Sequence, residues 1–155
     1  MASSLPLRQK LADTQAYFAK YNYPLTPDEL WYWQHGTRFS KSKIEKLLKN
    51  YALSIKHWKL RKQREAYSKK KWIIAKRVGE QLKKFPFIAA VYVTGALAMN
   101  NCPQNDDIDL MIVTSPNCLW ITRFFVNLYL WQLRRLPGQT SAPDKICPNL
   151  WLDTN

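Results

Sequence analysis

Hydrophobic positions follow a helical period through the first half of the chain. Residues 5–20 have the composition of a helix. In NYPLTPDELWYWQHG, Thr26 can cap a second helix, with Pro27 at its first position and Glu29 completing a capping box. Gly36 is suited to end that helix. The pattern therefore predicts two short helices in this part of the chain.

A third short helix is predicted in SKSKIEKLLKN. Ser42 and Glu45 can form its capping box, and Ile44, Leu47 and Leu48 share one face. Three tightly joined helices are typical of helix-turn-helix or winged-helix units. A helical cap that packs on the rest of the chain and binds nothing explains the same pattern equally well.

The longest helical pattern runs from residue 55 to about residue 84. Its apolar side chains recur at helical steps and so form one stripe. The stripe consists of Leu60, Tyr67, Ile74, Val78, Leu82 and Phe85. The remaining positions are strongly basic, because residues 56–84 hold 12 Lys and Arg against 2 Glu. We therefore expect one continuous helix with a positively charged exterior.

From residue 85 onward the pattern becomes strand-like. FIAAVYVTG is rich in β-forming residues and ends at Gly95, and DIDLMIVT has the same character. Between them, ALAMNN can form a short helix and CPQND a loop. A helix capped by Ser115, with Pro116 first, continues to residue 136 and is apolar almost all round, so we expect it to be buried against the sheet. KICPNLWL is a third predicted strand.

This order of elements is typical of an α/β or α+β sheet domain. We expect an α+β protein with a small mixed sheet, preceded by a helical, winged-helix-like region and a long basic helix. The predicted divisions are 1–55 for the helical region, 56–84 for the basic connecting helix and 85–155 for the sheet domain. The chain stops three residues after the third strand. Either this domain is minimal or the sequence is part of a longer one.

The charge of the chain changes near residue 84, where the helical pattern gives way to the strand-like one. Residues 1–84 contain 20 Lys and Arg against 6 Asp and Glu, whereas residues 85–155 contain 4 against 5. This asymmetry favours a polyanionic partner, nucleic acid first and anionic membrane second. Lys69–Lys71 and Arg134-Arg135 are candidate phosphate contacts, although solvated faces explain both equally well. The cluster Trp31–Trp33 could stack on bases, but we favour core packing at this helical spacing.

Cysteine and histidine are too scattered for a zinc site or a disulfide framework. They are Cys102, Cys118, Cys147, His35 and His57. The N-terminal MASSLPLRQK has no apolar core of a signal peptide, and the most apolar helical stretch, residues 118–133, is too short to span a bilayer. We therefore expect a cytoplasmic protein with reduced thiols and no membrane partner.

Three acids stand where the second strand begins: Asp106, Asp107 and Asp109. Side chains alternate along a strand, so Asp107 and Asp109 should point to one side while Ile108 and Leu110 point toward a core. Two same-side carboxylates about 7 Å apart repel each other, and a divalent cation relieves that repulsion. Hard oxygen ligands favour Mg²⁺ or Mn²⁺. Asp106 has the opposite parity, which indicates a solvated loop residue.

Gly95 ends the preceding strand directly before the short helix. That geometry permits a close backbone approach to a phosphate, with helix N–H groups pointing at it. The stretch VTGALAMNNCPQNDDIDLMIV resembles the signature of the DNA polymerase beta-like nucleotidyltransferase superfamily. Thr94-Gly95-Ala96 and Asp107-Ile108-Asp109-Leu110 stand at the spacing of that signature. The chain as a whole is similar to proteins with a helical N-terminus, a basic helix and a minimal nucleotidyltransferase domain.

The resemblance implies a reaction and roles for four residues. Asp107 and Asp109 would be the catalytic, metal-binding acids that hold Mg²⁺ or Mn²⁺, and Gly95 and Ala96 would bind the nucleoside triphosphate (NTP). The activity would be transfer of a nucleoside monophosphate to a hydroxyl group of a nucleic acid or a protein.

Two features depart from that family. The small hydroxyl residue that normally follows the glycine is Ala96 here. The third carboxylate, which the family carries on a later strand, has no counterpart in the middle of KICPNLWLD, where Asn149 stands. Asp144, Asp153 or a segment beyond residue 155 could supply it.

Two other functions fit the same sequence. A copy of the domain that has lost catalysis could bind nucleic acid through its basic half. An antitoxin-type minimal nucleotidyltransferase would modify or mask a protein partner.

Overall fold

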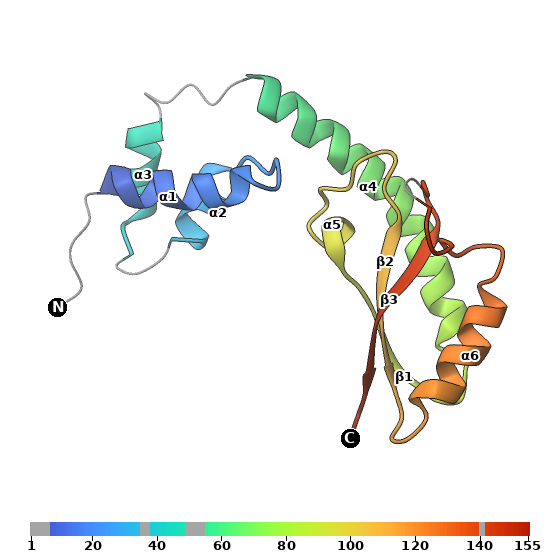
Figure 1. Cartoon of the computed structure of the whole chain (residues 1–155). Helices are drawn as coiled ribbons and strands as arrows, with labels where there is room; N and C mark the ends of the chain where they lie inside the picture. Colours follow the sequence, from blue (N-terminus) through green and yellow to red (C-terminus); the bar gives the residue numbers. More distant parts are fainter. Residues whose placement is uncertain (1–6, 35–37, 49–54, 140–141) are drawn as a thin grey trace. The chain divides into compact units, whose positions relative to one another are not determined.

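The computed structural model describes residues 7–34, 38–48, 55–139 and 142–155, and it is an α+β protein, as predicted (Figure 1). The chain forms two compact units, residues 1–63 and 64–155, which divide within the long helix. The helices are α1 Leu7–Ala19, α2 Pro27–Tyr32, α3 Lys41–Leu48, α4 Ile55–Leu82, α5 Gly95–Ala98 and α6 Leu119–Tyr129. The strands are β1 Ile88–Val93, β2 Ile108–Thr114 and β3 Ile146–Asp153.

The start of α2 forms as its local sequence predicts. Glu29 N donates to Thr26 Oγ1 at 3.1 Å, and Thr26 N donates to Glu29 Oε2 at 2.8 Å. These bonds confirm the capping box, and Pro27 is the first helical residue. The helix ends at Tyr32, and the predicted stop at Gly36 lies outside the described residues.

Glu29 also binds the first part of α4 within the first unit. Arg61, which is buried, donates to both carboxylate oxygens of Glu29 at 2.7 and 2.8 Å. Burial alone would raise the pKa of Glu29, but hydrogen bonds from Arg61, Thr26 and Tyr23 lower that pKa from 4.5 to about 2. At least one of the basic residues of α4 is therefore structural.

The predicted start of the third helix is wrong. The Ser40 carbonyl accepts hydrogen bonds from the N–H groups of Lys43 and Ile44, so α3 begins at Lys41 and Ser42 lies inside the helix instead of capping it. Ile44 is buried in a small core, as expected, whereas the side chains of residues 47 and 48 lie outside the described part. The described residues of this unit form helices and no strand.

The aromatic cluster at the end of α2 is exposed. The exposed fractions of Trp31, Tyr32 and Trp33 are 37%, 59% and 48%, so the expected core packing is wrong. Leu30 is the residue of this helix that is buried. A six-residue helix has only one face to bury, and Leu30 occupies it.

The sheet of the second unit is mixed, as predicted. The strand order is β1-β2-β3, with β1 antiparallel and β3 parallel to the central β2. Side chains of β2 alternate between buried and half-buried along its whole length. The sheet therefore has one face toward a core and one face away from it.

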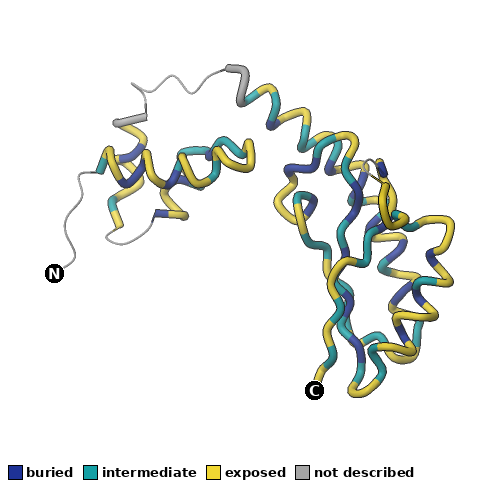
Figure 2. Tube along the Cα trace, in the orientation of Figure 1, coloured by how far each residue is buried: buried dark blue, intermediate teal, exposed yellow. Residues whose placement is uncertain are grey.

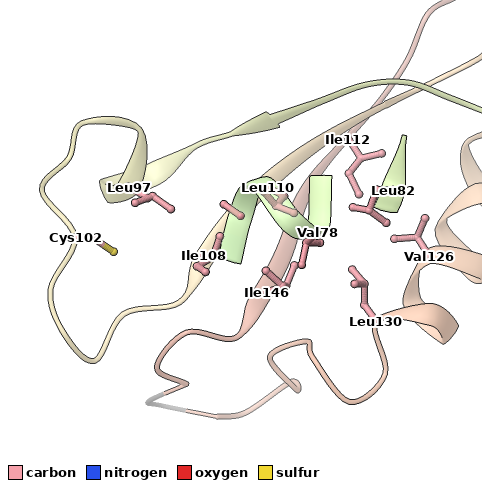
Figure 3. Close-up of a cluster of buried hydrophobic side chains, with 11 residues drawn as sticks. Val78, Leu82, Leu97, Cys102, Ile108, Leu110, Ile112, Val126, Leu130 and Ile146 are labelled. Atoms are coloured by element: carbon pink, nitrogen blue, oxygen red, sulfur yellow. The ribbon is translucent and has the colours of Figure 1, made fainter. Parts of the chain in front are cut away.

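Helices α4 and α6 pack on the core face of the sheet (Figure 3). The core includes Ala75, Val78, Leu82, Leu97, Cys102, Ile108, Leu110, Ile112, Val126, Leu130 and Ile146. The buried positions of α4 run through Ser68, Lys71, Ala75, Val78 and Leu82. In the middle of α4 the buried positions are Ser68 and Ala75, each one residue after the predicted Tyr67 and Ile74. Ser68 and Lys71 form hydrogen bonds to the loop that precedes β2, which explains this shift.

α6 is less buried than its apolar sequence predicts. The Ser115 carbonyl accepts from Cys118 N in a preceding turn, so Cys118 is the N-cap and the predicted cap at Ser115 is wrong. Only the face with Thr122 and Val126 is buried in the helix, because one helix on one sheet buries one face (Figure 2). The exposed apolar residues of α6 are Trp120, Ile121, Phe124, Phe125, Leu128 and Tyr129.

None of the helices in the described ranges combines the length and the apolar character that a bilayer crossing requires.

Candidate active site

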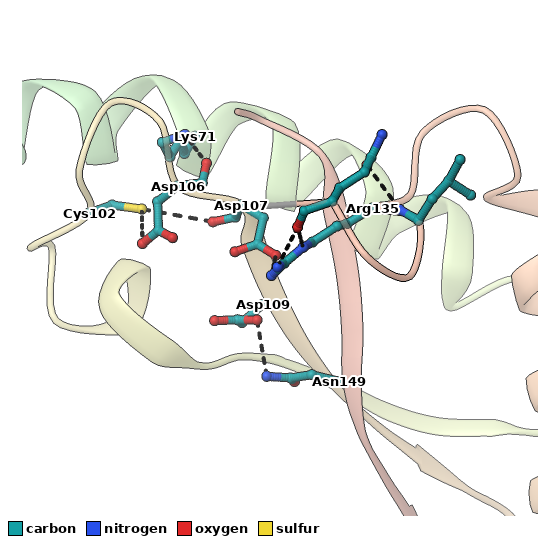
Figure 4. Close-up of polar contacts among 9 residues, drawn as sticks. Lys71, Cys102, Asp106, Asp107, Asp109, Arg135 and Asn149 are labelled. Carbon is teal, nitrogen blue, oxygen red and sulfur yellow. Dashed lines mark hydrogen bonds and ion pairs between the residues drawn. The ribbon is translucent and has the colours of Figure 1, made fainter. Parts of the chain in front are cut away.

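The acid pair lies at the start of β2 on the face away from the core. Ile108 and Leu110 are fully buried, and Asp109 between them points to the opposite side (Figure 4). Asp107 precedes the strand, and its side chain converges with that of Asp109. The predicted parity of these four residues is confirmed.

The glycine bend, the backbone turn at Gly95 between β1 and α5, lies against the carboxylate of Asp109. Gly95 has a φ of +63°, and a Cβ built on it would stand 2.3 Å from Asp109 Oδ2. Thr94 N donates to the Asp109 carbonyl at 3.0 Å, which fixes the two strands at this point. Glycine is thus required both by the backbone conformation and by the carboxylate that occupies the space of a side chain. Gly95 and Ala96 form the first turn of α5, where helical N–H groups have no intrahelical partner.

β3 adds two side chains that the sequence did not single out as site residues. Cys147 is the register partner of Asp109, and its sulfur and the carboxylate oxygens of Asp107 and Asp109 all lie within 4.8 Å of one another. Asn149 donates its side-chain amide to Asp109 Oδ1 at 3.0 Å. Asn149 stands two residues after Cys147, so strand alternation puts it on the same face of the sheet as Asp109. Asn149 therefore lies beside Asp109 on β3, the strand on which the third carboxylate was expected.

Arg135 neutralises the other acid. Its Nη1 donates to Asp107 Oδ2 at 3.0 Å, and the Asp107 side chain is only 8% exposed. The Nε and Nη2 groups of Arg135 both donate to the Gln139 carbonyl, which holds the guanidinium in place. The hydrogen bond to Asp107 raises the pKa of Arg135.

Burial and charge favour the protonated forms of two side chains in the cluster. Burial raises the pKa of Asp109, and the charges of Asp107 and Asp106 raise it further. Burial, followed by the charges of the two acids, raises the pKa of the Cys147 thiol to about 11. At neutral pH the thiol is therefore protonated and can donate a weak hydrogen bond to a carboxylate.

The donor set of this cluster fits a hard cation. Two oxygens bound to one Mg²⁺ lie at most about 4.2 Å apart, since each Mg–O distance is about 2.1 Å. One carboxylate oxygen of Asp107 and one of Asp109 lie within 4.8 Å of each other, a separation compatible with a shared cation. A protonated thiol is a poor ligand for Mg²⁺ or Mn²⁺, and we assign no metal contact to Cys147.

α4 anchors the loop that carries the acids. Lys71, which is buried, donates to the Asp106 carbonyl at 2.6 Å and to Asp144 Oδ1 at 2.7 Å. Ser68 Oγ accepts from Cys102 N at 3.1 Å. Lys71 is therefore a structural cation, and neither alternative given for it, a phosphate contact or a solvated face, is correct. Asp106 is half-buried and held by this network, so its description as a solvated loop residue is also wrong.

Neither proposed third carboxylate reaches the acid pair. Asp144 is bound to Lys71, and Asp153 pairs in register with Thr114 at the opposite end of β2 from Asp109. Neither residue belongs to the cluster of acidic and thiol groups found in the described residues.

The contacts of Arg135, Asn149 and Lys71 span 28 to 73 residues of sequence, which explains why local patterns did not reveal them. The period of α4 did contain a signal for Lys71, because it stands at helical spacing from Ala75, Val78 and Leu82. A search of family models, curated proteins and solved structures finds no match to this chain.

Proposed function

We propose that this chain is a Mg²⁺-dependent nucleotidyltransferase that moves a nucleoside monophosphate from an NTP to a hydroxyl acceptor. The observation that supports this most strongly is the contact between Asp109 and Gly95, with the Asp107 carboxylate converging on the same point. Gly95 has a backbone conformation that favours glycine, and it lies against one acid of the converging pair. This arrangement supports a site in which the two acids share a metal ion beside a close backbone approach to phosphate.

Each residue has a role in this proposal. Asp107 and Asp109 hold Mg²⁺, which would neutralise charge on the phosphates during transfer. The first N–H groups of α5, at Gly95 and Ala96, would donate to the phosphates. Asn149 orients the Asp109 carboxylate through its hydrogen bond. Arg135 balances the charge of Asp107 before the metal binds.

The basic surface of α4 supports a nucleic acid as the acceptor. Six exposed Lys and Arg residues lie in the second-unit part of α4 or directly after its end: Lys69, Lys70, Lys76, Arg77, Lys83 and Lys84. Like charges on one helix repel one another, and phosphates relieve that repulsion. Binding through this surface should weaken steeply as salt rises.

A catalytically inactive nucleic-acid-binding module is the second candidate. It is favoured by Asn149, an amide beside Asp109 on the strand where the resembled family has its third acid, and by Arg135, which already pairs with Asp107. In that case the basic surface would bind nucleic acid and the acid pair would bind no nucleotide.

Calorimetric titration with Mg²⁺-ATP separates the two candidates. The enzyme should bind Mg²⁺-ATP, and the double variant Asp107→Asn/Asp109→Asn should not. Asp153→Asn is the matched control, because it removes a carboxylate from the far end of the same sheet. If wild type and double variant bind nucleic acid alike and neither binds nucleotide, the binding module is the correct function.

Incubation with labelled NTPs, Mg²⁺ and total cellular RNA and protein then identifies the acceptor. Label on RNA supports a nucleic-acid acceptor, and label on one protein supports the antitoxin-type alternative. Absence of label from both, with intact Mg²⁺-ATP binding, would argue against transfer to either class.

A further inference from the structure

A basic pocket lies at the outer edge of β3, next to the acid pair. Its volume is about 300 Å³, at the lower end of the range for small-molecule sites. Arg123, Arg134 and Arg135 line it, and the guanidinium of Arg135 is already paired with Asp107. Among the described residues, no acidic side chain lines it.

Backbone pairing places two of these arginines. Ile146 N donates to the Leu133 carbonyl and Arg135 N donates to the Ile146 carbonyl, both at 2.8 Å. The segment that follows α6 is thereby fixed along β3, and the Gln139 carbonyl holds the side chain of Arg135. The backbone of Arg134 and Arg135 and the side chain of Arg135 are therefore positioned before any ligand arrives, which lowers the entropy cost of binding.

Arg134 has an unmet hydrogen-bonding group at this pocket. Its Nε is buried and has no hydrogen-bond partner within the described part of the chain. Buried donors in folded proteins are almost always paired. A pocket that is lined by arginines, one of which keeps an unpaired donor, suits an anionic ligand.

We propose that this pocket binds a phosphate group of a substrate. The positive charges of Arg123 and Arg134, neither of which forms an ion pair among the described residues, match the charge of a phosphate better than that of a single carboxylate. Planar guanidinium donors also suit the oxygens of a phosphate. Cys147 lines the pocket and also lies within 4.8 Å of the acid oxygens, so the phosphate would lie beside the acid pair. The role of the pocket in the reaction rests on the proposed function, whereas its affinity for phosphate does not.

Titration of the chain with inorganic pyrophosphate in EDTA at constant ionic strength tests the pocket without metal. We expect Arg134→Gln and Arg123→Gln to weaken binding roughly tenfold to a hundredfold, as for loss of a hydrogen bond between charged groups. Arg8→Gln, which removes an exposed arginine from α1, should leave the affinity unchanged. Arg134→Gln should also not lower the denaturation midpoint, because its Nε has no partner to lose.

Two further ligands identify the source of the phosphate. A non-hydrolysable ATP analogue with Mg²⁺ that loses affinity in Arg134→Gln assigns the pocket to the nucleotide. A 5′-phosphorylated dinucleotide that loses affinity, relative to its unphosphorylated form, assigns it to the acceptor. Equal pyrophosphate affinity in wild type and both variants overturns the proposal. If wild type binds pyrophosphate through Arg134 but never binds Mg²⁺-ATP, the pocket stands and the nucleotidyltransferase function fails.

Discussion

Gly95→Ala tests whether the glycine bend and Asp109 form one site. The φ of +63° lies in the left-handed region, where a side chain costs about 1–2 kcal/mol. The added Cβ would stand 2.3 Å from Asp109 Oδ2, and side-chain contacts of this kind are essentially never shorter than 3.0 Å. The Asp109 carboxylate must therefore move by at least 0.7 Å, the difference between these two distances. This movement takes it away from the position in which it accepts the hydrogen bond from Asn149.

We expect two measurable effects from this change. The free energy of unfolding, measured by urea denaturation, should fall by about 1–2 kcal/mol because of the backbone strain. Mn²⁺ affinity, measured by electron paramagnetic resonance, should fall about tenfold to a hundredfold, the usual cost of disturbing the orientation of a metal ligand.

Two other glycines provide matched controls. Gly138→Ala introduces a side chain at a φ of +84° with no atom within 4 Å of its Cβ, so it should lower stability and leave Mn²⁺ affinity intact. Gly79→Ala lies inside α4 with open space around it, so it should raise stability by about 0.5–1 kcal/mol. The reasoning is refuted if Gly95→Ala binds Mn²⁺ as tightly as Gly138→Ala does.

Two further predictions concern buried ionic contacts. Lys71→Met should lower the free energy of unfolding by about 2–3 kcal/mol, because it removes charged hydrogen bonds to the Asp106 carbonyl and to Asp144. Lys70→Met at an exposed neighbouring position should change it by less than about 0.5 kcal/mol, and equal effects in urea denaturation would contradict the structural role of Lys71. The pKa of Glu29 is lowered from 4.5 to about 2, so its contribution to stability is complete above pH 4.5 and lost as pH falls toward 2. Acid titration of stability should therefore be shallower in Glu29→Gln over that interval, and identical titration curves would exclude this contribution.

Local signals in the sequence predicted local structure well. The capping box of Thr26 and Glu29 depends on residues three apart, and it forms as expected. The alternation around Ile108 and Leu110 correctly separated the core face of β2 from the face that carries Asp109. The capping box predicted at Ser42 does not form, because the Ser40 carbonyl accepts the first hydrogen bonds of α3 and the helix begins before Ser42. The residues of the predicted box do not reveal this earlier start.

Features that depend on distant contacts could not be predicted from patterns. The exposure of α6 is set by the number of elements available to cover it, since its sequence is apolar on nearly every face. Arg135 reaches Asp107 only because the backbone around it pairs with Ile146. Asn149 reaches Asp109 only because β3 pairs with β2 in a register that sets Cys147 opposite Asp109. The acids of the candidate site were therefore predictable, and their partners were not.

Anomalous diffraction from crystals soaked in Mn²⁺ and a non-hydrolysable ATP analogue tests the central claim most directly. The account predicts an anomalous peak between the carboxylates of Asp107 and Asp109, with phosphate density against Gly95. Nucleotide density without a peak at this position, or a peak coordinated by other residues, would contradict it.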